Sequence, residues 1–237
     1  MNITLTFRLK DRLPTEVEQL SDLWKVATLL APLGLPVDDW YPPADTPEQS
    51  VANKAFNDDG PTRAAVAILA AEQQDKQSPG LRMFGVWNGR EGTGAAGFDT
   101  SLSVVAGSPL SVFSLQSKRV PTLADQALVV PLLMGLLEIW SARSIEVRPY
   151  KYGSQKVFPK RPGAGWILCL PQVLSFKEIP EARQLIPVMD GKKQRGTLIL
   201  SVIDEPFDAN NPEHVRVANA IEMRLVDQDL LPHFADL

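Results

Sequence analysis

Length, composition and charge exclude several classes of protein. The chain has 237 residues, of which 44% are hydrophobic and 22% are charged, so it is long enough to bury a core and too apolar for global disorder. Its formal net charge of −4 disfavours a protein that holds nucleic acid in a basic groove. We expect one large domain or two intimate lobes, with residues 1–237 forming a single α+β domain.

Cysteine usage and hydropathy favour a cytoplasmic protein. The one cysteine, Cys169, lies in the apolar run 166–170, so no intramolecular disulfide can form and a buried core position is expected. Residues 1–10 alternate apolar and polar side chains and lack the basic start and long apolar stretch of a signal peptide. The longest apolar segment, residues 127–140, is shorter than the roughly 20 residues that span a bilayer. We therefore expect no membrane partner.

The chain begins with a predicted strand and a predicted helix. Alternation indicates a half-buried strand with one face formed by Ile3, Leu5, Phe7 and Leu9. Thr15 and Glu18 then form a capping-box pattern that can satisfy free amides at a helix start. Pro32 and Gly34 end this helix. Its apolar residues recur at helical spacing, at Val17, Leu20, Trp24, Ala27 and Ala31.

Residues 34–116 are predicted to form a loop, a helix and three strands. Residues 34–61 are rich in Pro, Asp and Gly and include a short helix start at Thr46 and Pro47. A helix over 62–74 and a turn over 77–80 follow. The periodicity then changes to alternation in the strands 81–87, 98–105 and 110–116. Turns at 88–89 and 107–109 favour an antiparallel meander.

The second half is predicted to contain a core helix, three strands and a final helix. Thr122 is expected to cap an apolar helix over 123–141. Strands are predicted over 144–148, 166–170 and 197–203. Asn211 and Pro212 begin the last helix, whose apolar face is Val215, Ala218, Ile221 and Leu225. Because strands do not alternate regularly with helices, the predicted class is α+β, with mostly antiparallel sheet packed against helices.

One glycine motif imitates a dinucleotide-binding fingerprint. Residues 92–97 match GxGxxG, but the fingerprint works only where the last glycine opens a helix that holds pyrophosphate. Residues 98–104 look like a strand instead. We interpret the motif as a glycine turn and expect no cofactor.

The sequence contains no convincing catalytic set. The two histidines, His214 and His233, accompany no cluster of metal ligands and no GxSxG pattern, so we expect neither catalytic residues nor a metal site. Adjacent acids, as in Asp204-Glu205, are typical of a solvated face. Glu146 and Arg148 near Lys151 come closest to a nuclease centre, but with a cation where an acid is needed.

An acidic loop with aromatic residues is the candidate binding surface. Acids steer a basic partner, and aromatics supply contact area with few rotors to immobilise. The alternative is that Trp40 and Tyr41 anchor the loop to the core while the acids are simply solvated. The stretch 204–208 carries the same ambiguity. The candidate residues are Asp38, Asp39, Trp40, Tyr41, Asp45, Glu48, Asp58 and Asp59.

Three motifs together resemble a known family. They are Trp40, the segment AFNDDGP at 55–61 and the segment GVWNG at 85–89. Their order is similar to that in the immunity protein 52 family of bacterial polymorphic-toxin systems. The resemblance implies an antidote to a restriction-endonuclease-like toxin that would cut DNA in the producing cell, and it assigns no contact residues.

We therefore expect a cytoplasmic immunity protein that is not an enzyme. Its partner would be a cognate nuclease toxin of a type VI secretion or polymorphic-toxin system, and it would be a monomer when free. A first alternative is a secretion-system adaptor that binds a chaperone or structural component. A second is an enzyme on a small metabolite, using His214 or His233 with a carboxylate.

Overall fold

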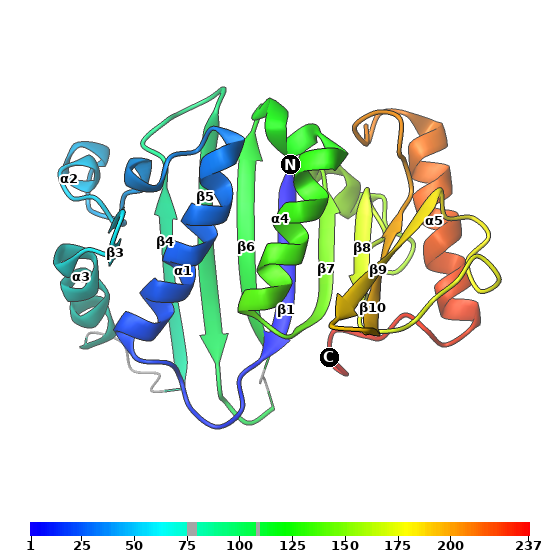
Figure 1. The fold of residues 1–237 in the computed structure, drawn as a ribbon, viewed down its shortest axis with the longest axis horizontal. Coiled ribbons are helices and arrows are strands. Elements are labelled where there is room, and N and C mark those ends of the chain that lie inside the picture. Colours follow the sequence, from blue (N-terminus) through cyan, green and yellow to red (C-terminus); the bar gives the residue numbers. More distant parts are fainter. Residues whose placement is uncertain (75–79, 108–109) are drawn as a thin grey trace. The chain divides into compact units, whose positions relative to one another are not determined.

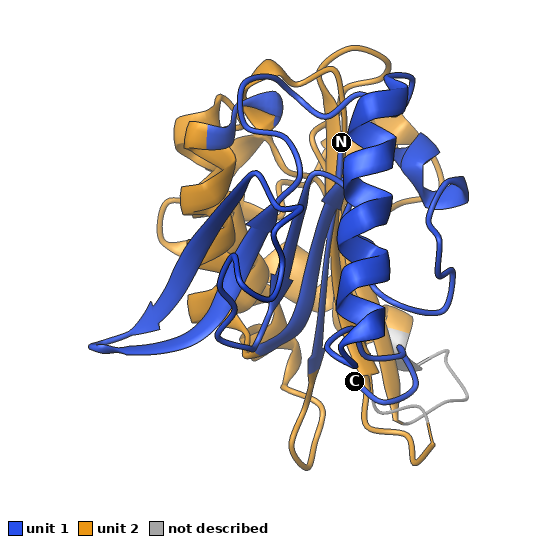
Figure 2. Ribbon diagram, turned by 90° about the vertical axis from the view of Figure 1, so that its right-hand side faces the viewer, with its two compact units in different colours: residues 1–7, 124–126, 142–237 blue, residues 8–123, 127–141 orange. Residues whose placement is uncertain are grey.

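The chain folds as two compact units, each combining helices with antiparallel strands. The structure, a computed structural model, describes residues 1–74, 80–107 and 110–237. Unit 1 contains residues 1–7, 124–126 and 142–237, and unit 2 contains residues 8–123 and 127–141 (Figure 2). The predicted α+β class is confirmed. The predicted turns at 77–80 and 107–109 lie partly outside the described residues.

Unit 2 is built on a three-stranded antiparallel meander. Its strands are β4 (Leu81–Trp87), β5 (Ala95–Ser103) and β6 (Leu110–Lys118), in the order β4-β5-β6. This confirms the three predicted strands. The β4–β5 turn is closed by Asn88, whose side chain donates to the carbonyl of Gly94 at 2.8 Å and accepts from the amide of Ala96 at 3.0 Å.

Helix α1 (Glu16–Leu30) covers one face of this meander (Figure 1). The predicted capping box is present, since the Thr15 hydroxyl and the Glu18 carboxylate each accept a backbone amide of the other residue. The predicted buried face is wrong at Val17, which is 53% exposed. The reason is that the buried stripe follows Gln19, Leu20, Leu23, Val26, Ala27 and Leu30, which leaves Val17 on the outer side of the helix.

A buried polar network fixes α1 on the meander. The guanidinium of Arg82, in β4, donates to Gln19 Oε1 at 2.6 Å and to Glu16 Oε1 at 2.8 Å. The Gln19 amide in turn donates to the Thr100 hydroxyl of β5 at 2.9 Å. The side chains of Arg82 and Thr100 therefore point toward α1, and residues of opposite parity point away from it.

The remaining elements of unit 2 include the apolar helix α4 (Gln126–Ile139), whose first residue belongs to unit 1. The prediction that Thr122 caps this helix is wrong. Thr122 lies in a 3₁₀ turn, η3 (Pro121–Ala124), and its hydroxyl donates to the carbonyl of Leu33 at 2.7 Å. Shorter elements are η1 (Ala31–Leu33), η2 (Val37–Asp39), α2 (Pro47–Val51), the strand pair β2 (Phe56–Asn57) and β3 (Gly60–Pro61), and α3 (Arg63–Gln74).

An aromatic cluster forms the centre of the unit 2 core. Phe98 of β5 lies between Trp40 and Phe113, with ring centroids 4.5 Å and 6.3 Å away. Phe113 stacks on Trp140 at 5.0 Å, and Phe56 stacks on Phe98 at 6.4 Å. Aromatic pairs at these separations add to the stabilisation from burial.

Unit 1 contains a five-stranded antiparallel arrangement and a long helix. Its strand order is β1 (Asn2–Arg8), β7 (Ala142–Arg148), β8 (Ile167–Leu170), β10 (Lys193–Leu200) and β9 (Gln184–Asp190). The prediction missed β9, which contains Pro187 and pairs with β10 at the end of this order, where a missing amide is tolerated. The predicted last helix is confirmed as α5 (Pro212–Asp227), capped by Asn211. The unit also contains the 3₁₀ turn η4 (Tyr150–Ser154).

Across the described ranges, no helix combines the length and apolarity that crossing a membrane requires.

Replacing Phe98 by alanine is expected to destabilise unit 2 by about 3–5 kcal/mol, because its ring is 1% exposed and lies between two other rings. The free energy of unfolding in urea measures this loss. The control Val17→Ala removes an exposed side chain and should change stability by no more than about 0.5 kcal/mol. Equal effects of the two variants would contradict this view of the core.

Candidate functional site

The cysteine and both histidines are either buried or already engaged in contacts. Burial raises the pKa of the Cys169 thiol to about 12, so the thiol stays protonated at neutral pH, as expected of a core residue. Among the described residues, no three His, Cys, Asp or Glu side chains are grouped so that they could hold a metal ion.

Both ring nitrogens of His214 have partners. Nδ1 accepts the backbone amide of Asp208 at 3.0 Å, and Nε2 lies 3.1 Å from Glu205 Oε1. These contacts attach the segment 205–208 to the first turn of α5. His233 is exposed, and its Nε2 lies 2.7 Å from the guanidinium of Arg161. The contacts of both histidines are those of loop anchors.

The glycine motif at 92–97 is a turn followed by a strand. Gly92 and Gly94 adopt positive φ values of 70° and 84°, and β5 begins at Ala95. The motif therefore opens a strand, and no helix N-terminus follows it to hold pyrophosphate. The interpretation as a glycine turn is confirmed.

Two buried carboxylates in unit 1 organise the segment 149–166. Glu222 of α5 accepts the Tyr152 hydroxyl at 2.7 Å and the amides of Val157 and Ala164 at 2.9 Å and 3.0 Å. Burial raises the pKa of Glu222 and of Tyr152 above their ordinary values. With three donors on one carboxylate, Glu222 has the environment of a structural group.

Glu146 plays a similar part on β7. It accepts the amide of Gly163 at 2.9 Å and lies 3.5 Å from both Lys156 Nζ and Arg148 Nε. Lys151, which the sequence placed near this acid, instead donates to Asn210 Oδ1 at 2.5 Å. Glu146 is thus surrounded by cations and an amide, an arrangement that does not match a metal-dependent nuclease centre.

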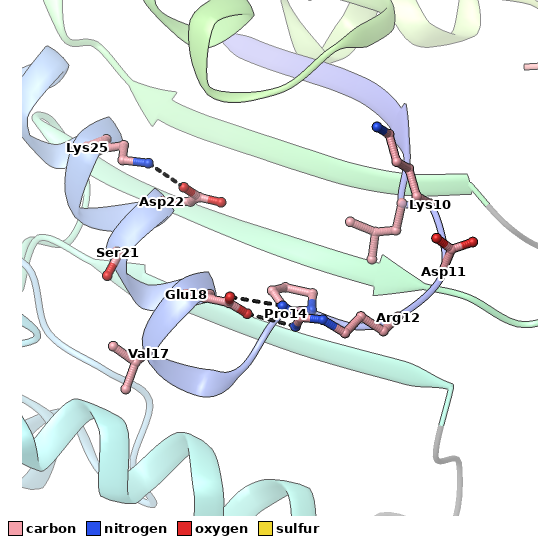
Figure 3. A pocket seen from close by; sticks show the side chains of 10 residues that line it. Lys10, Asp11, Arg12, Pro14, Val17, Glu18, Ser21, Asp22 and Lys25 are labelled. Carbon is pink, nitrogen blue, oxygen red and sulfur yellow. Dashed lines mark hydrogen bonds and ion pairs between the residues drawn. The ribbon is translucent and has the colours of Figure 1, made fainter.

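An open groove runs between the segment 9–14 and the first turns of α1 (Figure 3). Its volume is about 580 Å³, and four of its six charged side chains form two ion pairs. Arg12 donates to Glu18 at 2.8 Å, and Lys25 donates to Asp22 at 2.8 Å. The other two, Lys10 and Asp11, are of opposite sign, so the lining carries no net charge.

The predicted acidic loop forms an exposed surface of unit 2, here called the acidic surface. It comprises η2, α2, β2 and the β2–β3 turn, residues 38–59, with six carboxylates and one lysine. Asp39 is half-buried, and the other five carboxylates are exposed: Asp38, Asp45, Glu48, Asp58 and Asp59. The segment carries a net charge of −5, whereas the whole chain carries −4. The negative charge is therefore concentrated locally.

Trp40 and Tyr41 occupy anchoring positions in this loop. The Trp40 indole is fully buried against Phe98, which matches the core alternative that the sequence left open. Tyr41 is half-buried, and its backbone exchanges hydrogen bonds with that of Trp87 in β4 at 2.8 Å and 3.1 Å. The Trp40 indole is thus turned away from any surface that a partner could contact.

The three motifs singled out in the sequence meet beneath the acidic surface. The amide of Ala55 donates to the carbonyl of Trp40 at 2.7 Å, and the Trp87 indole donates to the Ser50 hydroxyl of α2 at 2.7 Å. The positive φ of Gly60, 137°, permits the tight β2–β3 turn. These motif residues hold the acidic loop in place.

Two of the six carboxylates are paired with cations. Lys54 donates to Asp38 Oδ2 at 2.6 Å, and this hydrogen bond lowers the pKa of Asp38. Arg90 Nη2 lies 4.0 Å from Asp39 Oδ2. Hydrogen bonds from its own backbone amide and from Thr46 lower the pKa of Glu48. Asp45, Glu48, Asp58 and Asp59 are therefore the carboxylates best placed to attract a basic partner.

One acid that sequence analysis did not single out is Asp99 of β5. It points to the face of the meander opposite α1, because its neighbours Phe98 and Thr100 point toward the buried core. It is half-buried, and within the described part of the chain no donor or cation lies against it. Burial accordingly raises the pKa of the Asp99 carboxyl.

Taken together, the chain is a two-unit α+β protein with a locally acidic, rigidly supported surface. It resembles in fold a solved structure described as Pseudomonas aeruginosa T6SS protein PA0821, with a TM-score of 0.55 and 12% sequence identity. The match covers 93% of this chain and 75% of that chain. No protein-family model and no curated protein matches the chain, so the resemblance to the immunity protein 52 family stays a prediction.

Replacing Asp99 by asparagine is expected to stabilise the protein at pH 7 but not at pH 3. The folded state raises the pKa of Asp99, so it binds this proton more tightly than the unfolded chain does. The contribution of Asp99 to the free energy of unfolding is therefore most favourable at low pH. It falls as pH rises through the pKa of Asp99 in the folded state. Asparagine removes this loss.

Urea unfolding of both proteins between pH 3 and pH 7 checks this prediction. The difference in free energy of unfolding between Asp99→Asn and the unmodified protein should increase as pH rises. Ser101→Ala, a neighbour that does not titrate, serves as the control and should shift the curve equally at all pH values. A pH-independent difference for Asp99→Asn would contradict the raised pKa.

Proposed function

We propose that this protein is a cytoplasmic immunity protein that binds and neutralises a cognate nuclease toxin of a type VI secretion or polymorphic-toxin system. It acts as a stoichiometric inhibitor without turnover. The observation that carries the proposal is the acidic surface, where six carboxylates and one lysine lie on a loop anchored by buried side chains.

The acidic surface suits the partner in charge. A nuclease presents basic and metal-binding surface to DNA, and an acidic protein can occupy or flank that surface. Anchoring by Trp40 and Phe56 reduces the conformational entropy lost when the loop is bound. The fold likeness to a type VI secretion protein and the motif resemblance support the same biological setting.

A secretion-system adaptor is the second candidate, and one feature favours it. The segment 148–161 of unit 1 has five basic residues and no acidic one. Tyr150 in this segment is 85% exposed, in a loop held by Glu222 and Glu146. The exposed residues Tyr150, Lys151 and Lys160 of the segment fit an acidic partner. An adaptor of this kind would support export without protecting cells from the toxin.

The product of the neighbouring gene is expected to form a stable complex with this protein and to lose its toxicity. Purified proteins mixed in equal amounts should co-elute from a sizing column, and co-expression should restore growth. The absence of both co-elution and protection would refute the inhibitor. A complex that forms without protecting cells would favour the adaptor.

Reversing the charge of Asp45, Glu48, Asp58 and Asp59 to lysine is expected to slow association by about tenfold or more at low salt. Asp38 and Asp39 are left intact because they pair with Lys54 and Arg90. The association rate by stopped flow at several salt concentrations measures this effect, and the variant should show a weaker salt dependence.

The matched control reverses four exposed carboxylates of unit 1, namely Asp190, Asp204, Asp227 and Asp236. This control changes the total charge by the same amount as the unit 2 variant does. Its association rate should be much closer to that of the unmodified protein than the rate of the unit 2 variant is. A larger effect of the control would move the proposed interface to unit 1.

A further inference from the structure

On the face of the meander opposite α1, residues that lie directly across from one another on β4, β5 and β6 form rows, and Asp99 lies in the central one. In the central row, Gly85 of β4 and Ser114 of β6 lie directly across from Asp99 on either side. The neighbouring rows begin with Met83, opposite Ser101, and with Trp87, opposite Gly97. The positions next to Asp99 in its row and along its strand therefore carry glycine or serine. Larger side chains stand at the diagonal positions, Met83 and Trp87 on β4 and Val112 and Gln116 on β6.

The two neighbours in the central row leave the carboxylate accessible. A Cβ atom at Gly85 would lie 2.9 Å from the Cβ of Asp99, so any larger residue there would crowd the acid. Ser114 is short and half-buried. The carboxylate can thus be approached from above its strand by a side chain of another molecule.

Apolar groups adjoin this position on β4. Met83 is 56% exposed and Leu81 is 41% exposed, and both lie on the face opposite α1. An aliphatic stem that ends in a cation could pack on these side chains while its charge reaches the acid.

The same face is continuous with the acidic surface. The Trp87 indole donates to Ser50 of α2 at 2.7 Å, so α2 borders the row that begins with Trp87. Glu48 lies in the same short helix. A basic protein attracted by the acidic surface would therefore meet the Asp99 face at its edge.

We propose that the face of the meander opposite α1 belongs to the protein-binding surface, and that Asp99 receives an arginine or lysine side chain of a basic protein partner. This inference rests on the proposed function and names the anchor of its interface. A carboxylate without a donor is unfavourable in the free protein, and an incoming guanidinium can satisfy both of its oxygens. The acidic surface then governs the approach, and Asp99 governs how long the complex lasts.

Binding constants of the complex with the neighbouring gene product test the proposal. Asp99→Asn, which keeps the shape of the side chain, is expected to weaken binding by about tenfold or more, chiefly through faster dissociation. Met83→Ser should weaken binding severalfold. The control Asp190→Asn changes an exposed acid of unit 1 and should stay within about twofold of the unmodified protein.

The outcomes separate this proposal from the proposed function. If the complex forms and Asp99→Asn binds as tightly as the unmodified protein, the role of Asp99 is overturned while the inhibitor stands. If no complex forms, the proposed inhibitor fails, and the site is tested directly by titrating ¹⁵N-labelled protein with N-acetyl-arginine amide.

In that titration, amide shifts at Gly85, Asp99 and Ser114 that disappear in Asp99→Asn would support the site. The absence of such shifts would overturn it. Shifts produced by Mg²⁺ alone would indicate a metal site, and concentration-dependent dimerisation abolished by Asp99→Asn would indicate a second copy of this chain. Either result would also overturn the proposal.

Discussion

The candidate surface depends on the burial of one indole ring, that of Trp40. This ring is fully buried and 4.5 Å from Phe98, so it ties an otherwise exposed loop to the meander. The carbonyl of the same residue accepts the amide of Ala55, which brings β2 and the turn with Asp58 and Asp59 alongside. An aromatic residue in an acidic loop thus acts from inside the protein. In the proposed complex, the contribution of Trp40 would be rigidity, because a loop that is already ordered loses less entropy on association.

Charge compensation distinguishes structural carboxylates from those available to a partner. Glu222 is fully buried but accepts three hydrogen bonds, so its desolvation is offset within unit 1. Asp38 is exposed and paired with Lys54, an arrangement that contributes little energy in water. Asp99 is half-buried with neither a donor nor a cation among the described residues. Only in this third case does the arrival of an external cation relieve an existing electrostatic cost.

Local patterns predicted most of the fold because burial acts on alternate side chains. The three meander strands were predicted to within three residues at every end, since one face of each lies on the core. Strand β9 was not predicted because it contains Pro187. Proline argues against a strand unless that strand is known to lie at the edge of a sheet. Within the candidate site, the sequence indicated the acidic loop but left open whether Trp40 is buried or exposed. Asp99 carried no sequence signal, because its exposure depends on the register that places Gly85 and Ser114 beside it.

The modest net charge of the chain conceals an uneven distribution of charged residues along the sequence. Residues 38–59 of unit 2 carry a net charge of −5, and residues 148–161 of unit 1 carry five basic residues without an acid. Salt limits the electrostatic field of each charged segment to roughly 8 Å at physiological ionic strength. A partner therefore responds to the charge of the segment it approaches and not to the net charge of the whole chain. Composition alone therefore underestimates how selective electrostatic attraction can be. The basic partner proposed above would therefore respond to unit 2, where both the acidic surface and Asp99 lie.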